Sequence, residues 1–276
     1  MKRALRRLRV KDEWIVDTSR NRYEADYLEY VGRIVPDAVP KVIARGDGWF
    51  AMDYLAGLDN WKTVLLGGEC SPDTAAVAGD TLRRIHEFTR HNDVARARFS
   101  TLANFEQLRV EPYLITTGKR HPMLRQCFEQ AATELRSASE CLVHGDFSPK
   151  NLLVSADRHR VVVLDCEVAW YGDPAFDLAF LLNHLFLKAL LHAPAEPGFR
   201  QLAETFHDAY RPDSELERRT LRLLLLLMLA RVDGKSPVEY LTPEKQDVIR
   251  RYCSPRIQTD HVPSTDEWFR FLQTHT

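Results

Sequence analysis

A polar group of residues interrupts an apolar stretch in the middle of the chain. The segment Leu142–Val154 reads LVHGDFSPKNLLV, and we call its residues His144–Asn151 the polar loop. Its side chains follow the spacing H-x-D-x-x-x-x-N, which is typical of loops that transfer a phosphoryl group. In such loops the Asp accepts or orients the proton of the attacking hydroxyl, and the Asn holds a magnesium ion. We therefore take Asp146 as the candidate catalytic base and Asn151 as a candidate metal ligand.

A second candidate metal ligand follows the apolar run Val161–Leu164. Asp165 stands directly after this run, at the expected end of a strand. Together with Asp146 and Asn151 it would supply two carboxylates and an amide carbonyl. Oxygen donors of this kind suit a hard cation such as Mg²⁺ better than a soft metal.

Each of these residues has an ordinary structural explanation when it is taken alone. His144 could be a hydrogen-bonded structural histidine, Asp165 could cap a turn, and Asn151 could serve turn chemistry. The joint order is more informative, because two apolar runs bracket the polar loop and a turn and a third apolar run then lead to an Asp. That order favours a reaction site over three unrelated structural roles.

Short strands and a helix are expected to position the polar loop. Three apolar runs predict strands, at Cys141–Val143, Leu152–Val154 and Val161–Leu164. Ala156–His159 is turn-like and separates the last two. Asp173-Pro174 is a capping signal for a helix that runs to about Leu191.

The residues before this region predict a mixed part followed by helices. RNRYEADYLEYV (20–31) places apolar side chains at helical spacing. The β-prone runs KVIA (41–44) and WFAMDYL (49–55) flank a Gly-Asp-Gly turn, which predicts a hairpin. Further helices are expected from Ser71-Pro72, over Pro122–Ser137 and from about Phe199 onward.

Composition favours an ordinary globular protein. The 276 residues are 45% hydrophobic and 28% charged with a formal net charge of −1, so nothing supports a nucleic-acid partner. The five cysteines are scattered, and the N-terminal MKRALRRLRV lacks an apolar signal region, which leads us to expect a cytoplasmic protein. The apolar run Leu221–Ala230 is too short to span a membrane and predicts a buried helix.

The region of the polar loop resembles the aminoglycoside phosphotransferase and choline kinase family. VHGDFSPKNLLV and VVVLDCEVAWYGDPAFDLAFLL carry the resemblance, which covers nearly the whole chain. It implies an α+β, protein-kinase-like two-lobe fold. Residues 1–56 would form a truncated β-rich N-terminal lobe and hinge, and residues 57–276 a larger, mainly helical catalytic lobe. It also implies an ATP- and Mg²⁺-dependent kinase, with Asp146 as base and Asn151 and Asp165 as magnesium ligands.

The resemblance also assigns supporting roles near the polar loop. Asp177, in GDPAFDLA, and His144 would brace the loop. Glu167 could assist the metal, face solvent or make an ordinary hydrogen bond. Lys150 would help to neutralise phosphate charge unless it points into solvent. His86, on a predicted helix, is expected to be a packed or capping histidine.

The nucleotide side is expected in the N-terminal part. Lys2 resembles the lysine that contacts the nucleotide phosphates, and Glu24 resembles its ion-pair partner on the following helix. Two ordinary surface charges are the alternative. FAMDYLAG (50–57) resembles the hinge between the lobes, where the backbone of Met52, Asp53 and Tyr54 would meet the adenine.

The N-terminal part departs from the family in one respect. No G-x-G-x-x-G occurs in the first 60 residues, and if Lys2 is the nucleotide lysine, no residues before it remain for the Gly-rich loop. Two explanations remain open: the sequence starts too late, or the protein is a natural variant without that loop. The variant makes a catalytically impaired pseudokinase or a binding module the alternative to an active kinase. A metal-dependent phosphohydrolase has less support, because the His/Asp pairs of a two-metal site are missing.

The acceptor is expected to be a small hydroxyl compound. An amino alcohol, a sugar and a nucleoside-like compound all fit this description. A polycationic aminoglycoside should favour an acidic pocket in the helical C-terminal part. From Leu178 to the end, however, acidic and basic residues are equal in number, which gives no support to such an acceptor.

Overall fold

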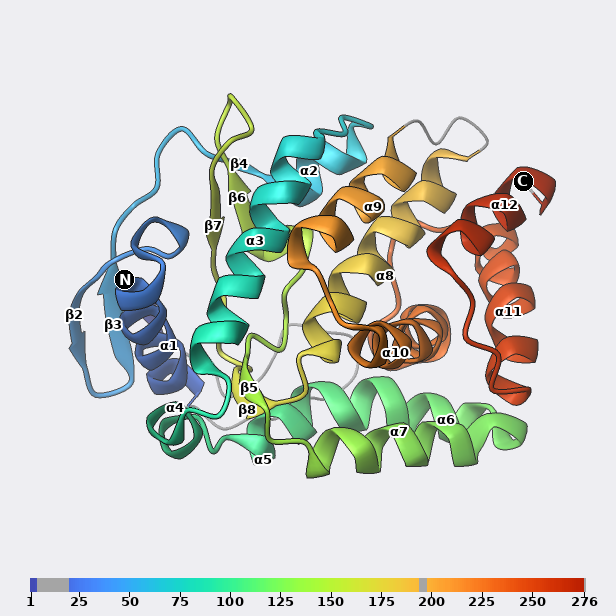
Figure 1. Ribbon diagram of the computed structural model, residues 1–276, viewed down its shortest axis with the longest axis horizontal. Coiled ribbons are helices and arrows are strands. Elements are labelled where there is room, and N and C mark those ends of the chain that lie inside the picture. Colours follow the sequence, from blue (N-terminus) through green and yellow to red (C-terminus); the bar gives the residue numbers. More distant parts are fainter. Residues whose placement is uncertain (4–19, 194–197, 276) are drawn as a thin grey trace.

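The computed structural model describes residues 1–3, 20–193 and 198–275 of the chain. Most of the basic N-terminal segment, residues 4–10, thus lies outside the described residues. Figure 1 shows a small part made of strands and a helix at one end of the molecule, beside a larger part in which helices predominate. This is the α+β organisation that the sequence predicts.

A three-stranded antiparallel sheet lies in the N-terminal part. Its strands follow the order β1 (Lys2–Arg3), β3 (Trp49–Met52) and β2 (Val42–Gly46). β2 and β3 form the predicted hairpin, and Gly48 in its turn has a φ of 70°, which glycine adopts without steric cost. The register pairs Lys2 with Phe50, so β1 fixes the position of Lys2 on this sheet.

Helix α1 (Arg20–Ile34) turns the predicted apolar face into the protein. Tyr27, Leu28 and Val31 are buried, and burying side chains of this size contributes about 1.5–3 kcal/mol each. Glu24 on the same helix is also buried, with 1% of its surface exposed. A carboxylate in such a place needs a charged or hydrogen-bonding partner.

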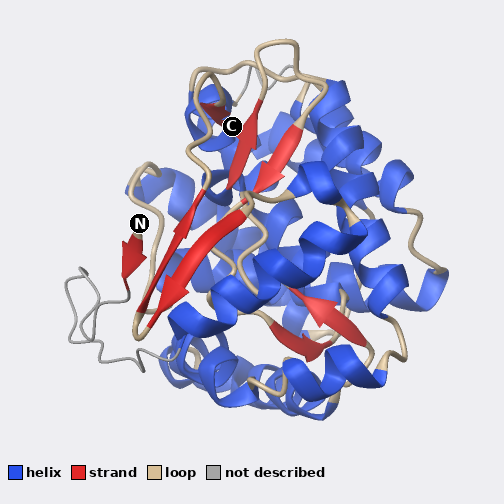
Figure 2. Ribbon diagram, turned by 90° about the vertical axis from the view of Figure 1, so that its left-hand side faces the viewer, coloured by secondary structure: helices blue, strands red, loops and turns tan. Residues whose placement is uncertain are grey.

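The polar loop crosses between two separate groups of strands. β5 (Cys141–Val143) precedes the loop and pairs with β8 (Trp170–Gly172). β6 (Leu152–Val154) follows the loop and lies between β4 (Asp59–Asn60) and β7 (Val161–Val163). Figure 2 shows the strands as separate groups surrounded by helices. The three strands predicted around the loop are confirmed, and their division between two sheets is an addition from the structure.

Helices form most of the remainder. They are α2 (Trp61–Leu66), α3 (Pro72–Thr89), α4 (Asp93–Arg98), α5 (Leu102–Phe105), α6 (Thr116–Arg120), α7 (Arg125–Ser137), α8 (Ala175–His192), α9 (Phe199–Tyr210), α10 (Ser214–Asp233), α11 (Pro243–Gln258) and α12 (Thr265–His275). A π-helical segment, Glu106–Ile115, joins α5 to α6, and 3₁₀ turns cover Pro36–Ala38 and Pro122–Leu124. The helices predicted from Ser71-Pro72, over Pro122–Ser137 and after Asp173-Pro174 are confirmed as α3, α7 and α8.

Helix α8 is the central helix of the larger part. Every residue from Ala175 to Leu190 is buried. By length and composition α8 could cross a membrane, but 89% of it is buried inside the protein, as in the core helix of a globular fold. Helix α10 packs against α8 and contains the run Leu221–Ala230, which confirms the predicted buried helix.

Candidate active site

Asp177 of α8 fixes the start of the polar loop. Its Oδ2 accepts the backbone N–H of His144 at 2.7 Å, and its Oδ1 accepts that of Gly145 at 2.9 Å. His86 Nε2 lies 3.2 Å from the same Oδ2. These partners satisfy a fully buried carboxylate that would otherwise be costly to bury. The bracing role predicted for Asp177 and the packed position predicted for His86 are confirmed.

His144 connects the polar loop to the end of β7. Its Nδ1 accepts the backbone N–H of Asp146 at 3.0 Å, so the proton of the neutral ring resides on Nε2. Nε2 in turn donates to the carbonyl of Leu164 at 3.0 Å. Burial lowers the pKa of His144, which agrees with a neutral ring. His144 therefore sets the position of Asp146 relative to Asp165, the residue after Leu164.

Asp146 lies buried between two cations. Arg109 Nη2 and Lys150 Nζ are each 2.9 Å from its Oδ2. Burial raises the pKa of Asp146, but the charges of Arg109 and Lys150 outweigh burial and bring it to about 2. The carboxylate is therefore ionised at neutral pH. Its Oδ1 makes no hydrogen bond or ion pair within the described ranges and can accept a proton donor from a ligand.

Arg109 is a site residue that the sequence interpretation missed. It comes from the π-helical segment, has 7% of its surface exposed, and donates from Nε to the carbonyl of Gly145 at 2.6 Å. It thus holds both the backbone and the carboxylate of the polar loop. The one signal in the sequence is a charge flanked by Leu108 and Val110, which suggests a buried arginine but does not identify its partner.

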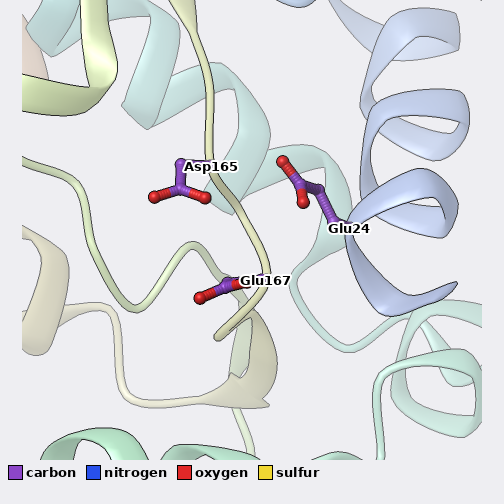
Figure 3. Close-up of side chains that lie close together, drawn as sticks. All are labelled: Glu24, Asp165 and Glu167. Atoms are coloured by element: carbon purple, nitrogen blue, oxygen red, sulfur yellow. The ribbon is translucent and has the colours of Figure 1, made fainter. Parts of the chain in front are cut away.

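Three carboxylates converge next to the polar loop, from α1 and from the segment after β7 (Figure 3). Oxygens of Glu24, Asp165 and Glu167 all lie within 4.8 Å of one another. The backbone of Asp165 has a φ of 57°, a left-handed conformation that few residues other than glycine adopt. Carboxylates this close repel one another unless cations lie between them.

Two basic residues supply the countercharge. Lys2 Nζ contacts Asp165 and lies 2.8 Å from Oε1 of Glu24, which confirms the predicted Lys2–Glu24 ion pair. Burial lowers the pKa of Lys2, but both carboxylates raise it above its ordinary value. Burial raises the pKa of Glu24 to about 7, although Lys2 opposes the shift. Arg20 Nη1 lies 2.6 Å from Glu167, so that residue makes an ion pair here.

A pocket of about 90 Å³ opens beside Asp146 and Lys150. The aromatic rings of Tyr113 and Phe180 form part of its wall, and side chains from α2, α8, α10 and the segment after α10 complete it. A larger cavity of about 350 Å³ lies between α7 and α10, but no residue of the polar loop lines it. Arginines of that cavity pair with acidic residues of its own wall, as Arg219 does with Glu140. The smaller pocket is therefore the one that Asp146 can serve.

Comparison with known proteins identifies the family. The family model described as phosphotransferase enzyme family matches residues 8–222, which is more than half of the chain. The chain belongs to this phosphotransferase family. The match agrees with the resemblance to aminoglycoside phosphotransferases and choline kinases that the polar loop carries.

Curated relatives of this chain include methylthioribose kinases. The chain is 27% identical over 261 residues to one from Pectobacterium atrosepticum, which covers 79% of this chain and 64% of the relative. It is 26% identical over 249 residues to one from Bacillus velezensis, with 77% and 62% covered. The chain thus spans less than two thirds of the length of these relatives.

Solved structures confirm the protein-kinase-like fold of the chain. An amicoumacin kinase in complex with AMP-PNP and Ca²⁺ superposes with a TM-score of 0.59 at 15% identity, covering 91% of this chain and 81% of that one. An aminoglycoside phosphotransferase from Alicyclobacillus acidocaldarius gives 0.52 at 17% identity, covering 93% and 85%. At such identities the likeness concerns the fold.

The structure brings most of the predicted site residues into two neighbouring groups. Lys150 and Asn151 contact Asp146 in the polar loop, and Lys2 joins Glu24 to Asp165. Lys150 is paired with Asp146, and its side chain is also 50% exposed to solvent. These contacts bear on position, and the roles assigned to the residues remain predictions.

The predicted hinge lies at the end of β3 and in the segment after it. Met52 is half-buried, the backbone N–H of Asp53 donates to the carbonyl of Lys41 at 3.0 Å, and Tyr54 is 92% exposed. The contact of Met52, Asp53 and Tyr54 with adenine stays a prediction.

The oxygen donors of the site fit the magnesium ion that the family implies. Asn151 Nδ2 donates to the carbonyl of Asp146 at 2.9 Å, while its Oδ1 accepts no hydrogen bond within the described part of the chain. The carbonyl of Asn151 accepts the N–H of Leu164 at 2.8 Å, which ties this ligand to the residue before Asp165. An amide oxygen and a carboxylate are hard ligands of the kind that Mg²⁺ prefers. Asn151 and Asp165 are therefore the residues that would hold it.

Proposed function

We propose that the protein is an ATP- and Mg²⁺-dependent kinase that transfers the γ-phosphoryl group to a hydroxyl of a small molecule. The observation that carries the proposal is the ionised Asp146 at the wall of a pocket, on the same loop as Asn151. Asp165 joins this arrangement because His144 and Asn151 both bond to Leu164, the residue before it. Membership of the phosphotransferase family supports the same reaction class.

Asp146 orients the acceptor in this mechanism. Its Oδ1 accepts the hydrogen bond of the acceptor hydroxyl and directs the oxygen toward the phosphorus. Because Arg109 and Lys150 hold its pKa at about 2, Asp146 is a weak base before the reaction. Orientation early in the step and receipt of the proton late in it are the roles that suit such a carboxylate.

The remaining charged groups of the site interact with the phosphates of the nucleotide in this mechanism. Asn151 and Asp165 would hold Mg²⁺, which would supply positive charge to neutralise the phosphates of the nucleotide. Lys2 and Lys150 lie next to Asp165 and Asp146, where each can shift from its carboxylate toward a phosphate oxygen. Positioning and electrostatic stabilisation supply most of the rate enhancement in such a site.

A sugar, with a hydroxyl that would receive the phosphoryl group, is the first acceptor to test. The curated relatives are named methylthioribose kinases, so methylthioribose belongs in the panel. An amino alcohol, a nucleoside and other sugars complete it, because the chain covers only part of those relatives.

Asp146→Asn tests the proposal directly. The amide keeps the shape of the side chain but cannot accept the hydroxyl proton, so we expect kcat to fall by about 100-fold or more. Phosphoryl transfer from ATP to the acceptor panel is measured in wild type and variant. Asp208→Asn, which changes an exposed carboxylate on α9, is the matched control and should retain wild-type turnover.

Two results would contradict the proposal. Equal turnover by Asp146→Asn and wild type would remove Asp146 from the reaction. A wild-type protein that transfers no phosphoryl group and shows no thermal shift with Mg-ATP would instead be a non-catalytic binding module.

A further inference from the structure

The pocket beside Asp146 carries more positive than negative charge. Its wall contains two carboxylates, on Asp146 and Glu239. Four basic side chains line the same space: Lys62, Lys150, Lys188 and Arg231. The equal numbers of acidic and basic residues in the C-terminal sequence therefore conceal a local excess of cations.

Both carboxylates of the pocket already have basic partners. Lys62 Nζ lies 2.5 Å from Oε1 of Glu239. Lys150, with Arg109 from outside the pocket lining, neutralises Asp146 at 2.9 Å. Within residues 20–193 and 198–275, neither Lys188 nor Arg231 has a carboxylate as an ion-pair partner. These two cations constitute the excess.

Lys188 is a buried lysine that has no polar partner among the described residues. It comes from the central helix α8, has 1% of its surface exposed, and lines the pocket. Its Nζ lies 5.3 Å from the ring centre of Tyr240 and makes no hydrogen bond within the described chain. Burial, with the nearby Lys62 and Arg231, lowers the pKa of Lys188 to about 7. An uncompensated ammonium costs free energy in such a place, and an anion in the pocket would remove that cost.

Arg231 of α10 makes hydrogen bonds only to neutral groups of the described chain. Its Nη1 contacts the carbonyl of Ser236, lies 3.0 Å from Oγ of that residue and lies 3.2 Å from the hydroxyl of Tyr113. Its Nε is buried without a hydrogen-bond partner. Neighbouring His184 is neutral and adds no further positive charge, because burial and Lys188 keep its pKa well below the ordinary value. Two unmatched cations thus share one pocket with the candidate base.

We propose that Lys188 and Arg231 form a subsite for an oxyanion of the acceptor, either a carboxylate or a phosphate ester. The inference rests on the proposed kinase function, because the acceptor is the molecule whose hydroxyl reacts. Recognition of the oxyanion itself depends on the charge of the pocket alone. A neutral sugar would leave both cations uncompensated, and a polycationic aminoglycoside would add repulsion. Charge-assisted hydrogen bonds from lysine and arginine are the strong contacts by which proteins select such groups.

Direct binding tests this subsite without requiring turnover. Wild type, Lys188→Met and Lys119→Met are titrated by calorimetry at pH 6.5, without nucleotide, with ribose, ribonate, ribose 5-phosphate and kanamycin. Methionine keeps the unbranched stem of Lys188 and removes its charge, while Lys119 is an exposed lysine of α6 outside the pocket. We expect wild type to bind at least one of the two acids, ribonate or ribose 5-phosphate, about tenfold more tightly than ribose. We expect Lys188→Met to bind that acid about tenfold more weakly than wild type does. Lys119→Met should bind like wild type.

Each outcome decides between the alternatives. A preference for ribonate identifies a carboxylate subsite, and a preference for ribose 5-phosphate identifies a phosphate-ester subsite; both support the inference. The inference is overturned if ribose or kanamycin binds as tightly as the acids. It is also overturned if the acids bind Lys188→Met as tightly as wild type, or if neither acid binds wild type. If Lys188→Met does not fold, Lys188→Gln replaces it in the titration. If the acids bind but wild type phosphorylates neither them nor any member of the acceptor panel, the kinase proposal is contradicted and the subsite stays in place.

Discussion

At the scale of single residues, the polar loop depends on side chains that hold its backbone. Asp177 accepts the backbone N–H groups of His144 and Gly145. Arg109 donates to the backbone carbonyl of Gly145, the residue before Asp146. Neither side chain needs to touch the reacting atoms. Both act by fixing where the carboxylate of Asp146 stands, which matters because small displacements of a catalytic group cost rate.

Asp177→Asn is therefore expected to affect stability and turnover together. One carboxylate oxygen becomes an NH₂ group that faces a backbone N–H, so a buried donor of the loop loses its acceptor. We expect the free energy of unfolding to fall by about 1–3 kcal/mol. We also expect kcat to fall while the KM for ATP changes little, because the loop moves and the nucleotide groups stay. Urea denaturation and steady-state kinetics measure the two effects, with Asp208→Asn as the control. A variant as stable and as active as that control would show that the loop is held by other contacts.

At the scale of elements, the close packing of α3 against α9 affects how the polar loop is held. A Cβ at Gly79 of α3 would lie 2.6 Å from the carbonyl oxygen of Phe206 and 2.9 Å from the Cβ of Ala209. Gly79 thus allows the two helices to approach closely. α3 also carries His86, which contacts Asp177, so the spacing of the helices bears on the bracing of the loop.

Gly79→Ala is expected to destabilise the protein although alanine favours helices. The added methyl group would force α3 and α9 apart, at a cost of about 1–3 kcal/mol that outweighs the gain of about 1 kcal/mol in helix propensity. Gly32→Ala in α1 is the matched control, since its Cβ would meet only Val39 at 3.5 Å, an ordinary contact. We expect that control to be neutral or slightly stabilised in urea denaturation. Equal stability of the two variants would mean that α3 and α9 separate without cost.

Elements whose signals are local in sequence could be predicted. The β2–β3 hairpin follows from its Gly-Asp-Gly turn, α1 from its helical spacing, and the strands around the polar loop from their apolar runs. The Lys2–Glu24 ion pair, Asp177 and His144 could also be assigned, because the resemblance to a known family marks their motifs.

The rest of the site depends on contacts between distant segments. Arg109 comes from a π-helical segment that carries no recognisable motif, yet it pairs with Asp146. Lys188 looks like an ordinary charge in an apolar helix until α10 and the segment after it close the pocket around it. Burial and pairing of a charge are properties of the packed chain, so composition alone gave a neutral balance where the pocket is cationic.

At the scale of the whole molecule, a buried lysine couples global stability to pH. Lys188 shares its pocket with titratable or charged groups from α2, the π-helical segment, α8, α10, the polar loop and the segment after α10. These are Lys62, His184, Arg231, Asp146, Lys150, Tyr113, Glu239 and Tyr240. All of them are present in wild type and in Lys188→Met, so the difference in unfolding free energy between the two proteins isolates the titration of Lys188 to a good approximation.

The difference between wild type and Lys188→Met should depend on pH in one direction. The pKa of Lys188 is about 7 in the folded protein, against about 10.4 in an unfolded chain. Below pH 7 both states carry the charge, and the folded protein bears the full cost of burying it. Between pH 7 and about pH 10 the unfolded chain binds a proton that the folded protein does not, so wild type gains stability as pH rises. We expect Lys188→Met to be more stable than wild type at pH 6, and this advantage to be smaller by about 3 kcal/mol at pH 9. Urea denaturation at both pH values measures it, with Lys119→Met as the control. An advantage that is the same at both pH values would show that Lys188 keeps its charge on folding and that the described pocket already compensates it.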